Sequence, residues 1–179
     1  MTAAHRRRSI AGFLRRAEAG TAAGLLAAVA VAMLFFLEGA LRLHPFSVPA
    51  ALASGLFGGG GSGPGTVAPA GSLIVAGVEL LEILGYTVLH LVAFAAVGAV
   101  AAFVLDVSAM WTGALGGAAF AGVTCTGLMY LVRWVVGTPV ALDVLGLPRV
   151  LLTNALAGAV IGLSLYLTGH HDPRDAAAP

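Results

Sequence analysis

The sequence has very little charge and no lysine at all. Only 9% of its 179 residues are charged and 59% are hydrophobic, whereas an ordinary soluble domain carries roughly 25% charged residues. Such a chain in water would expose far more apolar surface than it could bury. The composition therefore excludes a soluble globular fold, and lipid is the solvent that fits.

Cysteine is nearly absent as well, because Cys125 is the only one. An intramolecular disulfide, a paired-thiol redox centre and a cysteine-cluster metal site are therefore excluded. Cys125 lies inside an apolar run, where we expect it to act as a small buried hydrophobic residue.

Four apolar runs are each long enough to cross the hydrocarbon core, which takes about 20 residues as a helix. The sequence predicts a single all-α membrane domain over 1–179, a four-transmembrane-helix bundle. We place the spans at about 19–41, 83–105 with an outer extension at 73–82, 111–136 and 149–168, followed by a tail at 169–179. Residues 137–148 are expected to form an apolar loop.

The longest connection, residues 44–72, carries no charged residue. Pro45 and Pro49 are expected to stop the first helix, and residues 50–57 can form a short interfacial helix. Residues 58–65 read GGGGSGPG, and such a stretch cannot cross hydrocarbon with its backbone polar groups unsatisfied. We therefore place this Gly/Pro-rich loop outside the membrane.

The arginines predict the orientation of the chain. Five of them, at positions 6, 7, 8, 15 and 16, precede the first span, and Arg174 follows the last. Arg42, Arg133 and Arg149 fall at the opposite ends of the spans. Six arginines on the side of the termini against three on the other side favour a cytoplasmic location of both termini. The membrane is expected to be a cell membrane of the bacterial inner-membrane type. A nucleic-acid role for the basic tail is the alternative; its position before a span favours contact with anionic lipid.

Small residues recur at four-residue spacing within the spans. Gly20 with Gly24, Gly113 with Gly117, and Gly158 with Gly162 form GxxxG pairs. This spacing places both glycines on one helix face and lets two backbones approach closely. We therefore predict tightly packed helices.

Charged residues near the predicted outer surface form candidate structural contacts. Glu38 and Arg42 are four positions apart in the order that favours an ion pair. Glu79 and Glu82 are expected to meet Arg133 or Arg149. The alternative, a divalent cation on the two glutamates, lacks the Glu-x-x-His motifs of dinuclear carboxylate sites, so we predict no metal.

His90 is the only histidine well inside an apolar run, and an ionisable group there calls for a functional hypothesis. Asn154 and the stretch Thr124–Thr126 fall at a similar depth. We expect one polar layer in the outer half of the bundle, with His90 bonded to Asn154, Thr124, Thr126 or a backbone carbonyl. No cofactor is predicted; a haem or chlorophyll-type pigment ligated by His90 is one alternative, and proton or ion transport is another.

The sequence presents no convergent set of catalytic groups, so we expect a protein that is not an enzyme. The favoured hypothesis is an accessory or structural subunit of a larger membrane complex, with other membrane subunits and lipids as partners. A respiratory or a photosynthetic complex is one option for the parent assembly. The alternative is a small transporter or channel component that uses a polar layer around His90 and Asn154.

The orientation can be tested by labelling single cysteines with a membrane-impermeant reagent, after Cys125→Ala. We expect Ser62→Cys to be labelled from outside intact cells and Ser9→Cys to be protected. Labelling of the cysteine at position 9 from outside would overturn the predicted orientation.

Overall fold

The computed structural model describes residues 3–57, 73–105, 107–137 and 141–170. Within these residues, four helices are long and apolar enough to cross a membrane. They are α1 (Ala3–Leu41), α3 (Leu73–Val104), α4 (Met110–Val136) and α6 (Leu147–His170). The predicted four-helix membrane bundle is confirmed, and the Gly-rich stretch 58–65 lies outside the described residues.

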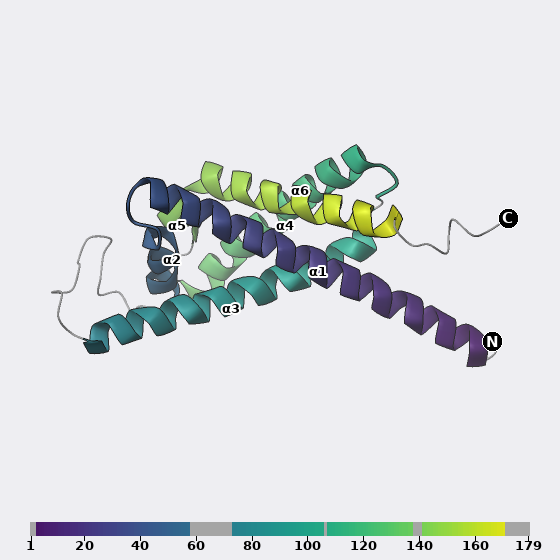
Figure 1. Ribbon diagram of the computed structural model, residues 1–179, viewed down its shortest axis with the longest axis horizontal. Helices are drawn as coiled ribbons and strands as arrows, with labels where there is room; N and C mark the ends of the chain where they lie inside the picture. Colours follow the sequence, from purple (N-terminus) through teal and green to yellow (C-terminus); the bar gives the residue numbers. More distant parts are fainter. Residues whose placement is uncertain (1–2, 58–72, 106, 138–140, 171–179) are drawn as a thin grey trace.

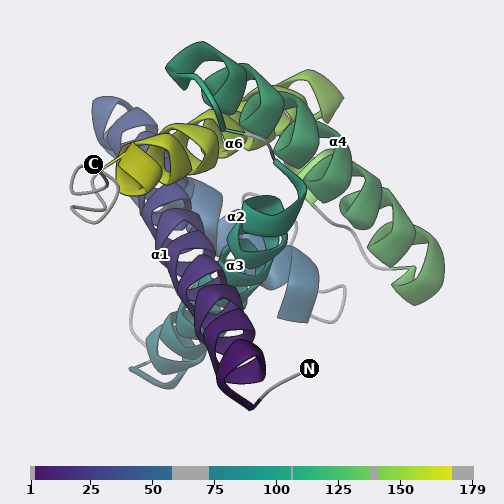
Figure 2. The ribbon, with the colours of Figure 1, turned by 90° about the vertical axis from the view of Figure 1, so that its right-hand side faces the viewer.

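The long helices form two pairs. α1 packs mainly on α3, and α4 packs mainly on α6, while α1 also contacts α6 and so joins the pairs (Figure 1). α3 and α4 have little contact with each other, and Figure 2 shows α4 at the edge of the molecule, away from α1 and α3. The start of α1 and the end of α6 lie at one end of the bundle, which we call the inner end; the opposite end is the outer end.

Glycines bring α1 and α3 together. A Cβ atom on Gly20 would lie 2.5 Å from the carbonyl oxygen of Gly98, and one on Gly24 would collide with the carbonyl of Phe94. A Cβ on Gly98 would in turn strike the carbonyl of Gly20. The two backbones are therefore in direct contact, which is the close approach that small residues allow in membranes.

The second pair, α4 and α6, is closed in the same way. Gly117 faces Gly158, and Gly113 faces Gly162, so that a Cβ on any of the four would meet the opposite backbone at 2.9 Å or less. Gly127, also on α4, has nothing within 4 Å of its Cβ position. The tight packing predicted from the GxxxG pairs is thus present at both crossings.

The core lies where α1, α3 and α6 meet, and alanine dominates its centre. Ala27, Ala28, Ala101 and Ala157 are fully buried, and larger side chains fill the space around them. These larger residues are Val31, Phe35, Phe94, Ile161 and Leu165.

Two short helices lie at the outer end (Figure 1). α2 (Ser47–Phe57) packs on α3, and it begins three residues before the predicted 50–57 because Pro49, expected to be a helix stop, occupies its first turn, where proline is tolerated. α5 (Ala141–Leu145) was not predicted, since residues 137–148 were expected to be a loop. It follows Gly137, which ends α4 at φ 70°.

The charges on α1 indicate how it sits in a bilayer. Glu18 and Glu38 are twenty positions apart with no charged residue between them, a rise of about 30 Å that matches the hydrocarbon core. The whole helix has 39 residues and is about 58 Å long. Its first turns therefore project beyond the core at the inner end, where Phe13 stacks on Phe103 of α3 with ring centroids 4.8 Å apart.

The glycine crossings predict opposite effects of one substitution at two positions of α4. Gly117→Ala should lower the stability of the purified protein by about 2 kcal/mol, because the new methyl group forces α4 and α6 apart. Gly127→Ala, the matched control, should raise it by a few tenths of a kcal/mol or more through helix propensity. Thermal unfolding in detergent measures both, and equal shifts at the two positions would refute the close crossing.

Candidate functional site

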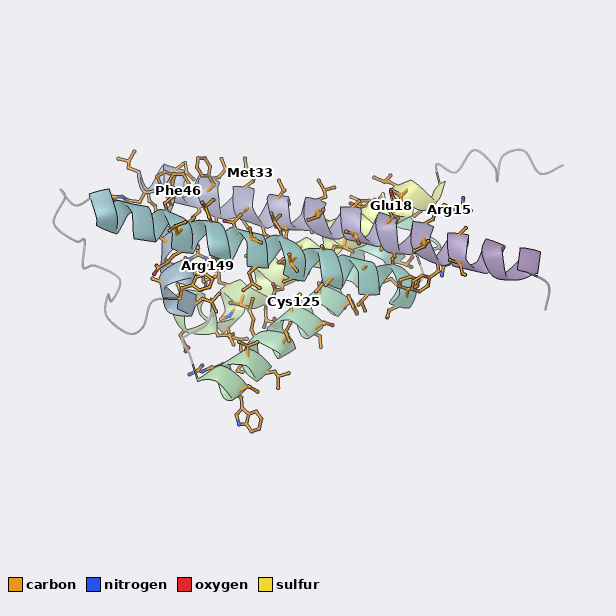
Figure 3. All side chains as sticks on the ribbon, turned by 90° about the horizontal axis from the view of Figure 1, so that it is seen from below. Arg15, Glu18, Met33, Phe46, Cys125 and Arg149 are labelled. Atoms are coloured by element: carbon orange, nitrogen blue, oxygen red, sulfur yellow. The ribbon has the colours of Figure 1, made fainter. Side chains whose placement is uncertain are left out.

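An ion-pair cluster joins α1 to α6 at the outer end. The Glu38 carboxylate binds Arg149 of α6 and also Arg42, one turn away on α1, at 3.2 Å. The Arg149 guanidinium also lies over the Phe35 ring, 5.5 Å from its centroid, and Figure 3 shows Arg149 at this end of the bundle. Glu38 and Arg149 side chains are each about one-third exposed, whereas Arg42 is 73% exposed. The predicted Glu38–Arg42 pair is present, and Arg149 extends it between helices.

Among the described side chains, Arg133 and Arg149 pair with residues other than the predicted Glu82. Arg133 binds Asp143 of α5 at 2.9 Å, and Arg149 binds Glu38. Arg133 is therefore neutralised by a residue of α5 and Arg149 by a residue of α1. The predicted glutamates lie on α3, which makes little contact with α4 and α6. Glu82 has no ion-pair partner within the described chain, and the side chain of Glu79 lies outside the described residues.

His90 of α3 bonds to the backbone of α1. Its Nε2 atom lies 3.3 Å from the carbonyl oxygen of Ala28. A carbonyl only accepts hydrogen bonds, so Nε2 carries the proton and donates. The rings of Tyr86 and Phe94 lie on either side, with centroids 5.9 Å and 4.7 Å away. Of the partners predicted for His90, the backbone carbonyl is the one observed.

A small cavity of about 60 Å³ lies beside His90. Its walls come from α1, α2 and α3, and only His90, Tyr86 and Thr87 contribute polar side chains; the rest are Val31, Ala32, Phe35, Pro49 and Leu52. The Thr87 hydroxyl donates to its own helix, to Ile83 O at 2.7 Å. This volume suits a water-sized molecule.

Asn154 belongs to a different interface. Its Nδ2 donates to the Thr126 hydroxyl at 3.1 Å, and both side chains are buried between α6 and α4. Thr124 is exposed. His90 therefore bonds within the α1–α3 pair and Asn154 within the α4–α6 pair. The one polar layer predicted from depth does not form among the described side chains, because helix pairing separates its members.

The described residues contain no group of three or more His, Cys, Asp or Glu that could hold a metal ion. Cys125 is buried on α4, near the middle of that helix (Figure 3). Among the described residues, the site offers hydrogen bonding at His90 and charge pairing around Glu38.

Comparison with known proteins finds no family, no curated protein and no solved structure that matches this chain. The function has to be argued from the geometry.

The Glu38–Arg149 contact should show energetic coupling. Arg149→Gln and Glu38→Gln should each lower stability by about 1–2 kcal/mol, because each leaves the other charge partly buried without its main partner. The double variant should cost less than the sum of the two. Arg42→Gln is the control and should change stability by less than about 0.5 kcal/mol, since that side chain is exposed. Strict additivity in this thermal-unfolding cycle would contradict the pairing.

Proposed function

We propose that this integral membrane protein is a non-catalytic subunit that packs against other membrane proteins in a larger complex. Its described side chains pair with one another in structural contacts: Glu38 with Arg149, Arg133 with Asp143, Asn154 with Thr126. Each of these contacts ties one helix to another. They stabilise a scaffold, which is the role expected of an accessory subunit.

The exposed face of α4 carries the proposal. This helix packs on α6 with one face, and the opposite face displays Thr124, Gly127 and Trp134. Gly127 has no neighbour within 4 Å of its Cβ position, and the Thr124 hydroxyl makes no hydrogen bond within the part of the chain that the structure describes. A glycine costs helix stability of about 1 kcal/mol relative to alanine. Glycine and a hydroxyl at mid-membrane suit contact with another helix better than contact with lipid.

A bacterial inner membrane, and a parent complex of the respiratory or photosynthetic type, remain part of the proposal. The choice of membrane rests on the arginine distribution and does not depend on the shape of α4. The alternative of a small transporter or channel component relied on a shared polar layer around His90 and Asn154. Because these residues bond in separate interfaces, the geometry favours the subunit.

The proposal is tested by purifying the tagged chain gently from its native membrane. We expect the wild-type chain to co-purify with stoichiometric partner subunits and the Gly127→Leu variant to lose them. The leucine side chain would occupy the exposed face of α4 and would contact no other part of this chain. Gly169→Leu is the matched control, since that glycine also has nothing within 4 Å, and it should keep the partners. In isolation, both variants should unfold at or slightly above the wild-type temperature, because leucine favours a helix more than glycine does.

Recovery of the chain alone as a homo-oligomer would contradict the proposal and favour the transporter. So would an unchanged set of partners with Gly127→Leu.

A further inference from the structure

The inner end of α1 carries the two described arginines that lack a carboxylate partner. Arg42, Arg133 and Arg149 at the outer end each bind an acidic side chain. Arg15 and Arg16 are exposed, and within the described chain no ion pair includes them. Figure 3 shows Arg15 and Glu18 near each other on α1, toward the inner end of the bundle. No described carboxylate pairs with these two cations, so an anion from outside the molecule can bind them.

The depth of these arginines follows from the length of α1. Glu18 and Glu38 mark the two edges of the hydrocarbon core. Arg15 and Arg16 therefore lie about 3–5 Å beyond Glu18 along the helix axis. The headgroup region adds roughly 5–8 Å on each side of the core. Both guanidinium groups are therefore level with lipid phosphates.

A row of large apolar side chains lies on the other side of the same turns. Ile10, Phe13 and Leu14 are 53%, 58% and 59% exposed, and their spacing of three and four positions places them on one face. Basic residues on one face and exposed Ile, Phe and Leu on another are the pattern of helices that lie at a membrane interface. A nucleic acid would match the arginines and leave these apolar groups without a partner.

We propose that the segment of α1 from Ile10 to Arg16 binds the phosphate groups of anionic phospholipids in the leaflet that faces the N-terminus. Arg15 and Arg16 pair with the phosphates, and Leu14 and Phe13, about 6–8 Å beyond Glu18 along the axis, lie within the headgroup region. Guanidinium groups suit this contact because they form bidentate hydrogen bonds with phosphate oxygens. The inference goes beyond the proposed subunit role and concerns a different end of the molecule.

The test uses the full-length protein, purified in a neutral detergent and stripped of lipid. Binding of phosphatidylglycerol and of phosphatidylcholine is measured by native mass spectrometry. We expect the wild-type protein to prefer phosphatidylglycerol, and Arg15→Gln/Arg16→Gln to weaken its binding roughly twentyfold. Arg15→Lys/Arg16→Lys should retain most of the preference. Arg42→Gln/Arg133→Gln, which also removes two arginines, should bind as the wild type does.

The wild-type protein provides a test that does not depend on the folding of any variant. Its preference for phosphatidylglycerol should fall as salt is raised from about 0.05 M to about 0.5 M, because exposed charges are screened. An equal affinity for the two lipids would overturn the proposal, as would unchanged binding after the glutamine substitutions. If a short DNA duplex bound at lower concentrations than phosphatidylglycerol does and displaced the lipid, that result would overturn the proposal in favour of nucleic acid.

Discussion

Direct contact between helix backbones is the constraint on which this structure depends. Lipid tails are as apolar as leucine, so helices in a bilayer gain little by burying apolar side chains against one another. Close approach provides the packing instead, and it requires glycine where the backbones meet. Gly20, Gly24 and Gly98 supply it for α1 and α3, and glycines at 113, 117, 158 and 162 supply it for α4 and α6.

The rest of the molecule is arranged by those two crossings. Each pair has its own polar contact between helices, His90 with Ala28 in the first and the buried Asn154 with Thr126 in the second. The pairs are then joined through α1 and α6, by the alanine-rich core and by the Glu38–Arg149 contact at the outer end. Because α3 and α4 have little contact, one face of α4 is left exposed, and that face supports the proposed association with other membrane subunits.

Much of the fold could be predicted from the sequence, because the length of an apolar run and the positions of prolines act locally. The GxxxG spacing likewise identified the residues at both crossings, except Gly98, which has no glycine four positions away. Which helix pairs with which is not a local property. Similar depth predicted a contact between His90 and Asn154, and a shared position near the outer surface predicted one between Glu82 and Arg149. In the structure the two members of each set lie on helices of different pairs. The short helix α5 has only five residues, too few for a periodic hydrophobic pattern. The Arg133–Asp143 pair that depends on it could therefore not be predicted either.

The pairing of helices is tested most directly by distances between spin labels at exposed outer-end positions, in a Cys125→Ala background. Labels on α3 at Leu81, on α4 at Trp134 and on α6 at Leu152 occupy side chains that are 70%, 83% and 71% exposed. The two-pair arrangement predicts that the label on α4 lies closer to the label on α6 than to the label on α3. A shorter distance from α4 to α3 than to α6 would contradict it.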